Sequence, residues 1–124
     1  GVATTSIWSE TDEIIGPEPD RATATSRLRG AANIVLQDIC DRPVGHVQHL
    51  TEPPVFALVL DALNHPGPAL ASRLPADICL QPLVPGQNPD DVVWANTVSY
   101  GQAVAAVETG PTVTSEPPVK AYAR

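Results

Sequence analysis

Proline constrains the fold of this chain more than any other residue type. Fourteen prolines and eight glycines are spread over 124 residues, and most of the prolines stand in closely spaced groups. Because proline fixes φ and lacks a backbone donor, such groups end helices and strands. The regular elements must therefore be short and much of the chain irregular. One such region is a surface loop that starts at Gly16-Pro17 and runs to about Gly30.

Two runs with strand composition remain between these breaks. Val2 to Trp8 is weakly alternating and rich in β-branched residues, and the acidic cluster 10–13 follows it. Asn33 to Cys40 is the second run, followed by a turn-rich segment and then His46. Along the chain, a strand is followed by a loop with carboxylates, and a second strand is followed by a loop with a histidine. This order is the first indication of a function.

Two helices are predicted further along the chain. Thr51 offers a capping hydroxyl, prolines occupy the first turn, and Val55 to Leu63 forms an apolar body. The segment 88–91 carries an N-cap, a first-turn proline and two acids that suit the helix dipole. These signals predict a helix over Ala95 to Val107, which Gly110-Pro111 ends.

Charge and hydropathy exclude several classes of function. Seven basic and fourteen acidic side chains give a formal charge of −7, which disfavours binding to nucleic acid or to anionic lipid. No apolar run approaches the roughly 18 residues that a transmembrane helix needs. The chain starts at Gly1, lacks methionine and shows no signal-peptide pattern, so we expect a processed or partial chain.

Cys40 and Cys79 are the only cysteines. A metal site needs more thiols or clustered histidines, so we expect a disulfide, with two buried free thiols as the alternative. His46 and His49 lack a third metal ligand in the sequence, and we expect no metal site there.

Asp12 and His46 are the candidate acid and base. In α/β-hydrolases a carboxylate and a histidine follow successive strands, and the carboxylate orients the imidazole that takes the proton of serine. The segment Thr97 to Gly101 imitates a nucleophile elbow around Ser99. That serine comes after the acid and the histidine, and the capping signals place it inside a helix, so we interpret the match as a coincidence.

At these residues the chain resembles the secreted lipases of the Candida antarctica lipase B type, including their bacterial relatives. The segment TTSIWSETDEIIGPE is similar to the family pattern YSxTDEIVQP, which implies that Asp12 is the triad acid. NIVLQDIC followed by PVGH matches the strand, cysteine and V-x-H pattern, which implies that His46 is the base. Gly45 departs from this pattern, because an acid commonly precedes the histidine.

The resemblance extends over essentially the whole chain. It implies a disulfide between Cys40 and Cys79, where ADICLQPLVPG is similar to the family segment xDxCxPLP, and the tail ETGPTVTSEPPVKAYAR is similar to AGPxxNCEPxxxxYAR. We expect residues 112–124 of this tail to be coil. The fold class implied is α/β. Residues 1–124 would form one C-terminal part of an α/β-hydrolase domain, without the half that carries the nucleophile. This part would contain the last two parallel strands, flanking helices and long irregular Pro-rich segments.

The function implied is that of a serine ester hydrolase, a triacylglycerol lipase or esterase, whose triad acid and base lie in this chain. The resemblance implies an ester or lipid substrate, no metal or organic cofactor, secretion, and a nucleophilic serine carried by the N-terminal half of the same hydrolase. A non-enzymatic secreted module that binds a partner through its Pro-rich loops is the alternative. Carried over by position, the substrate-binding residues are Ile14, Ile15, Ala103, Val104 and Val107.

Overall fold

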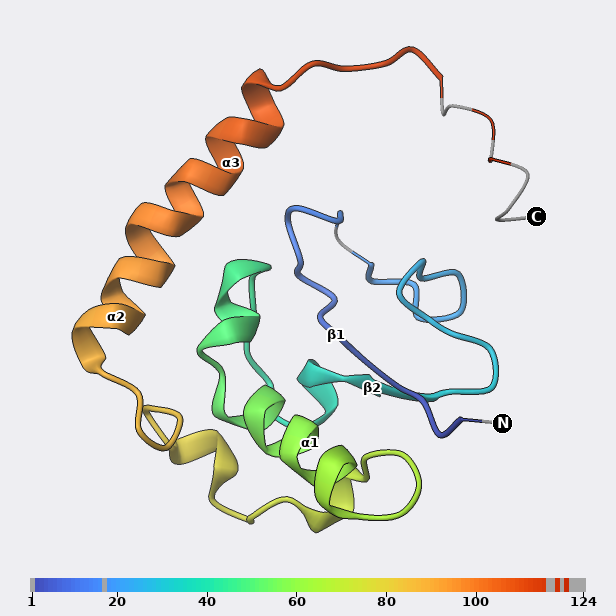
Figure 1. The fold of residues 1–124 in the computed structure, drawn as a ribbon, viewed down its shortest axis with the longest axis vertical. Helices are drawn as coiled ribbons and strands as arrows, with labels where there is room; N and C mark the ends of the chain where they lie inside the picture. Colours follow the sequence, from blue (N-terminus) through green and yellow to red (C-terminus); the bar gives the residue numbers. More distant parts are fainter. Residues whose placement is uncertain (1, 17, 116–117, 119, 121–124) are drawn as a thin grey trace.

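Two short parallel strands form the sheet of this protein, whose structure is a computed structural model describing residues 2–16, 18–115, 118 and 120. Strand β1 (Thr5–Trp8) pairs with β2 (Ala32–Val35), with Thr5 opposite Ala32 and Trp8 opposite Val35 (Figure 1). The parallel pairing that was predicted is confirmed.

Both strands are shorter than predicted. Val2 is 92% exposed, and the paired register begins only at Thr5. At the other end, the backbone carbonyl of Leu36 accepts hydrogen bonds from Ile39 and Cys40, which turns the predicted end of the second strand into a 3-10 helix. The apolar run of the sequence therefore covers a strand and the turn after it, because each places an apolar residue in the core, Val35 and Leu36. The 3-10 helices of the described residues are η1 (Leu36–Asp38), η2 (Val47–Leu50), η3 (Ala71–Arg73) and η4 (Ile78–Leu80).

Helix α1 (Pro53–Asn64) supplies the centre of the hydrophobic core. Its Leu58 is fully buried and packs in a cluster with Leu36, Val44 and Ala69. The prediction that Thr51 caps this helix is wrong: the N-cap residue is Glu52, and it makes no side-chain capping bond. Pro53 and Pro54 have no N–H for the Thr51 hydroxyl to accept, and that hydroxyl donates to the carbonyl of Gln48.

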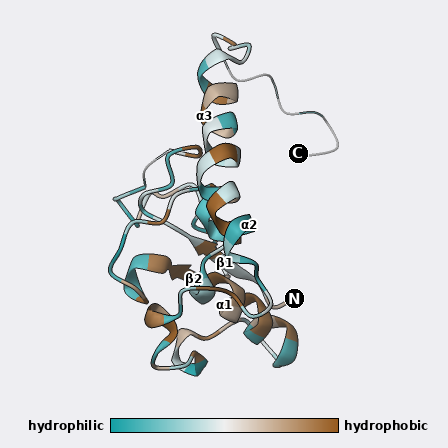
Figure 2. Ribbon diagram, turned by 90° about the vertical axis from the view of Figure 1, so that its left-hand side faces the viewer, coloured by the Kyte–Doolittle hydropathy of each residue, from teal (hydrophilic) through white to brown (hydrophobic). Residues whose placement is uncertain are grey.

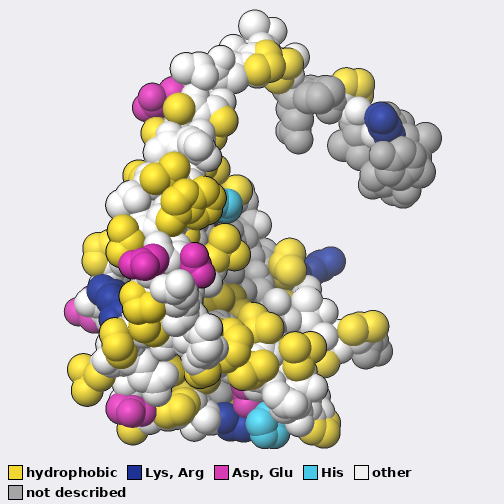
Figure 3. Space-filling model, turned by 60° about the vertical axis from the view of Figure 1, so that its left-hand side comes forward, with side chains coloured by type: hydrophobic (Ala, Val, Ile, Leu, Met, Phe, Trp, Pro, Cys, Tyr) yellow, Lys and Arg dark blue, Asp and Glu magenta, His cyan; other side chains and the backbone are white. Residues whose placement is uncertain are grey.

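A long helical segment rises away from this body (Figures 1 and 2). It consists of α2 (Pro89–Trp94), the π-helical turn η5 (Ala95–Ser99) and α3 (Tyr100–Thr109). The predicted N-cap is confirmed, since the Asn88 side chain accepts the backbone N–H of Asp90 at 2.9 Å. Figure 3 shows apolar side chains exposed along this segment. Its exposed large apolar residues include Val93, Trp94 and Val107.

Two links hold the irregular segments to the body. Cys40 and Cys79 form the predicted disulfide, with Cα atoms 5.6 Å apart. Asp61, buried on α1, receives two hydrogen bonds from the Arg73 guanidinium, each 2.6 Å long, and one from the backbone N–H of Leu70. The expected coil is observed over 111–115, while residues 116–117, 119 and 121–124 of the tail lie outside the described residues.

Helices long and apolar enough to cross a membrane are absent from the described part of the chain.

Candidate active site

Asp12 lies on the loop that follows β1, and this loop itself fixes its carboxylate. The side chain is buried, and its Oδ1 accepts the backbone N–H groups of Ile14 at 3.0 Å and Ile15 at 2.9 Å. An aspartate that bonds to the backbone two and three residues ahead forms a tight local turn. Its second oxygen is thereby held in one direction, away from the loop.

That second oxygen meets His46. The Nδ1 atom of His46 lies 2.8 Å from Asp12 Oδ2, as the sequence predicted for a paired acid and base. His46 follows β2 after the 3-10 helix η1 and an irregular segment that ends at Gly45, so both residues lie beyond the carboxyl ends of adjacent parallel strands. Because an ionised carboxylate only accepts, Nδ1 carries the proton and Nε2 of the neutral ring has a free lone pair.

The pKa of the Asp12 carboxyl lies below its ordinary value. Burial by itself would raise the pKa, but the hydrogen bonds from the Ile15 N–H, the His46 side chain and the Ile14 N–H together outweigh it. Asp12 therefore stays ionised to a lower pH than an ordinary aspartate does. In a catalytic triad an ionised carboxylate stabilises the imidazolium that forms when the base has taken a proton.

The pair opens onto a crevice of about 420 Å³ with a largely apolar lining. Ile15 lines it, as predicted, whereas Ile14, Ala103, Val104 and Val107 are not among the lining residues, and their substrate role stays a prediction. The sequence prediction did not include Trp8 and Leu50, which also line the crevice. Their positions in the chain could have indicated this, because Trp8 ends the strand before the acid and Leu50 closely follows the histidine. The lining residues are Ile7, Trp8, Asp12, Ile15, Ser26, His46, Val47, His49, Leu50 and Ser99.

Ser99 is the serine at the centre of the elbow-like segment 97–101. It lies inside the continuous helical segment, at the end of η5, as predicted, and it borders the crevice. In the described part of the chain, no serine hydroxyl forms a hydrogen bond with the imidazole of His46. The environment of Ser99 is thus a helix and not a strand-to-helix turn.

His49 has a different role from His46. Its Nδ1 donates to the backbone carbonyls of Gly45 at 3.0 Å and His46 at 3.1 Å. It therefore supports the loop of the candidate base and does not pair with Asp12. Over the described residues, no three His, Cys, Asp or Glu side chains come together in a way that could hold a metal ion.

Comparison with solved structures gives a lipase as a structural neighbour. The chain superimposes on the crystal structure of Aspergillus fumigatus lipase B with a TM-score of 0.77 and 31% sequence identity. The match covers 99% of this chain and 32% of that lipase, so the chain spans about a third of its length. No protein-family model matches the chain, and no curated protein matches its sequence. The resemblance to lipase B-type lipases is confirmed, and the neighbour implies an α/β-hydrolase-like fold.

Proposed function

We propose that this chain supplies the acid and the base of a Ser-His-Asp triad in a secreted serine ester hydrolase, a triacylglycerol lipase or esterase. The observation that carries the proposal is the 2.8 Å contact between Asp12 and His46 at the edge of an apolar crevice. The similarity to a fungal lipase supports the same reaction class.

In this reaction His46 Nε2 takes the proton from a serine hydroxyl while the serine oxygen attacks the ester carbonyl. Asp12 holds the ring in the required tautomer and stabilises the imidazolium that forms. The imidazolium then gives its proton to the leaving alcohol, and the acyl-enzyme remains. Water attacks the acyl-enzyme with the same base, which releases the carboxylic acid and restores the serine.

The serine belongs to a part of the hydrolase outside these 124 residues, and the chain is one C-terminal portion of the domain. Two observations support this part of the proposal. The matched lipase is about three times as long as the aligned region, and in the described residues no serine is bonded to His46. The proposed chemistry uses protein groups and water, so it requires neither a metal nor an organic cofactor.

The crevice favours an apolar acyl group. Trp8, Ile15 and Leu50 line it, and the last two are largely exposed, at 59% and 79%. Exposed apolar side chains beside a polar pair mark a binding groove more often than a bare surface. Ile14, Ala103, Val104 and Val107 remain candidates for contacts with the more distant part of the substrate.

An extracellular location fits the disulfide of this chain. The Cys40–Cys79 disulfide persists in an oxidising environment and is rare in the cytosol.

Hydrolysis of a short-chain nitrophenyl ester by the full-length hydrolase tests the proposal. His46→Ala should lower kcat by about six orders of magnitude, as loss of a triad base does. His49→Ala is the matched control on the same loop and should cost little. Equal activity of the His46 variant and the parent would overturn the proposal. The 124-residue chain alone should hydrolyse no ester, and labelling of Ser99 by a serine-directed phosphonate would show that the assignment of the nucleophile is wrong.

A further inference from the structure

The neighbours of Asp12 and His46 also pair with one another. Thr11 Oγ1 accepts the backbone N–H of Val44 at 2.9 Å and lies 3.2 Å from its carbonyl oxygen, to which it donates. Glu13 Oε2 accepts the backbone N–H of His46 at 3.3 Å. Three consecutive residues of the acid loop thus bond to two residues of the histidine loop, Val44 and His46.

Glu13 and Gly45 are in unusually close contact. A Cβ atom built on Gly45 would lie 2.7 Å from Glu13 Oε2 and 3.1 Å from Oε1, and carbon does not approach a carboxylate so closely. The φ angle of Gly45 is not positive, unlike that of four other glycines in the described chain. A side chain at position 45 is therefore limited by the Glu13 carboxylate and not by the backbone conformation. Because that carboxylate is the far end of a flexible side chain, an added Cβ atom would displace it.

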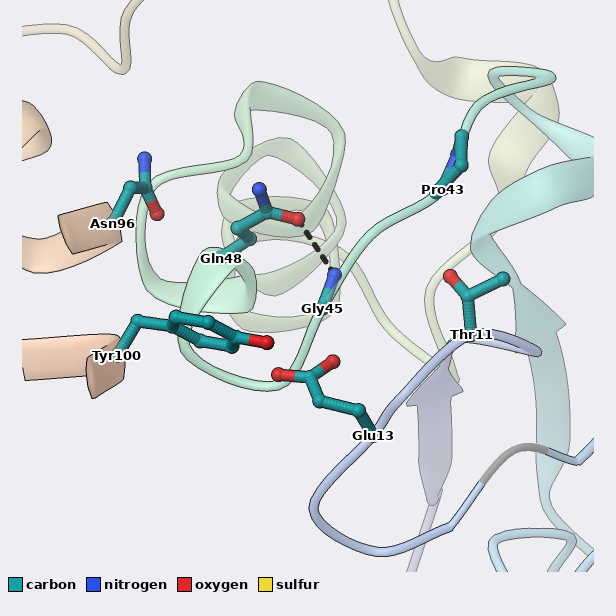
Figure 4. Close-up of a pocket in the computed structure, with 7 residues that line it drawn as sticks. All are labelled: Thr11, Glu13, Pro43, Gly45, Gln48, Asn96 and Tyr100. Atoms are coloured by element: carbon teal, nitrogen blue, oxygen red, sulfur yellow. Dashed lines mark hydrogen bonds between the residues drawn. The ribbon is translucent and has the colours of Figure 1, made fainter. Parts of the chain in front are cut away.

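Glu13 is half-buried, and leaving one of its carboxylate oxygens without a partner is costly if the residue has only a packing role. Its Oε1 is shielded from solvent and has no hydrogen-bond partner among the described residues. Buried carboxylate oxygens without partners are rare, and each one needs a reason. Figure 4 shows the carboxylate between Gly45 and the side chain of Tyr100, at a cavity of about 230 Å³.

The backbone groups of Gly45 and the N–H of His46 all form hydrogen bonds to side chains. Gln48 Oε1 accepts the N–H of Gly45 at 2.6 Å (Figure 4). His49 Nδ1 donates to the carbonyl of Gly45. Glu13 holds the next N–H, that of His46 itself. The side chain of His46 projects from this fixed backbone toward Asp12, so a shift of the backbone would move Nε2 relative to the nucleophile.

We propose that Glu13 is a positioning residue, which fixes the His46 imidazole through a hydrogen bond to the His46 backbone amide, and that Gly45 is the residue that admits its carboxylate. This inference rests on the proposed function, because positioning matters when Nε2 has to meet a serine.

Four variants of the full-length hydrolase test it. Glu13→Ala removes the acceptor and should lower kcat by about 10- to 100-fold with KM unchanged, the range expected from a displacement of about 1 Å. Glu13→Gln keeps an oxygen acceptor and should restore most of this loss. Gly45→Ala should resemble Glu13→Ala in the parent but should have little further effect when combined with it, because the clash partner is gone. Glu108→Ala, on the exposed surface of α3, is the matched control.

A spectroscopic readout separates positioning from stability. The Nδ1–H proton of His46, bonded to Asp12, should give a downfield NMR resonance in the parent and in Glu13→Gln, and a weakened or lost one in Glu13→Ala. The concentration of active sites, measured by phosphonate titration, corrects kcat for unfolded protein. If Glu13→Ala fails to fold, Gly45→Ala gives the same test, since its added Cβ displaces the carboxylate.

Three outcomes would overturn the proposal: a kcat per active site and resonance unchanged in Glu13→Ala, a Glu13→Gln variant as impaired as Glu13→Ala, or additive effects of Gly45→Ala and Glu13→Ala. Failure of the proposed function is distinguishable, because a parent without ester hydrolysis would contradict that function while the resonance still reports on the position of His46.

Discussion

Removal of the Cys40–Cys79 disulfide should lower the free energy of unfolding of this chain by a large amount. The bridge links residues 39 positions apart, and the loop that it closes contains His46 and all of α1. In the chain-entropy model a loop of this length constrains the unfolded state by about 4 kcal/mol. Because the total stability of a domain is about 5–15 kcal/mol, the loss would be a large share of it.

Cys40→Ala/Cys79→Ala is the appropriate perturbation. Cys40 is buried at 5% exposure, so a serine there would bury an additional hydroxyl, whereas alanine adds no polar group. Arg42 continues to join the two segments, since its guanidinium donates to the carbonyl of Cys79 at 3.0 Å and to Glu52 at 2.7 Å. The native geometry should therefore persist, and the effect should fall mainly on the unfolded state.

Urea unfolding followed by tryptophan fluorescence measures the effect. Trp8 is buried at 4% exposure and reports on the core, whereas Trp94 is already exposed at 55%. The midpoint should fall and the slope m should rise, because an unfolded chain without the cross-link exposes more surface. Reduced and alkylated parent protein is the control and should behave like the double variant. A loss below about 1 kcal/mol with an unchanged slope would refute the loop-entropy account of this bridge.

Three further predictions concern the site and the core. Asp12→Asn should lower kcat of the full-length hydrolase by about 10⁴-fold while the fold persists, because an amide donor facing Nδ1 favours the wrong tautomer; steady-state kinetics with far-UV circular dichroism checks this. Arg73 holds the pKa of Asp61 at about 2, below its ordinary value, so the stability from this pair is complete above the unfolded pKa and is lost as pH falls toward 2. Acid titration of the parent should show this loss, and the same titration of Asp61→Asn should not. Leu58→Ala should cost about 2–5 kcal/mol in urea unfolding, because Leu58 is fully buried in the core cluster.

The sequence could predict those parts of the site that depend on local order. Asp12 and His46 each follow a short apolar run, and parallel pairing of such runs brings the residues after them to one edge. The helix around Ser99 was predictable as well, because its N-cap, first-turn proline and terminal glycine are local signals. The only two cysteines left a single possible intramolecular pair.

Features that arise from contacts between distant segments were not predictable. The apolar run that ends at Cys40 continues past β2 into a 3-10 turn, because burial does not distinguish a strand from a buried turn. Thr51 looked like a helix cap from its neighbours, yet the carbonyl of Gln48 competes for its hydroxyl. Sequence patterns indicate which groups a residue can bond, and the tertiary structure decides which of them it reaches.

Gly45 shows the same limit at the site itself. From sequence alone it was only a departure from a pattern that commonly has an acid before the histidine. In the structure, a carboxylate does lie at this place, but Glu13 brings it from the other loop. An acid at position 45 would have to share this space with Glu13, and two carboxylates in contact repel each other. The absence of an acid at position 45 is therefore best interpreted together with the Glu13 carboxylate that lies beside it.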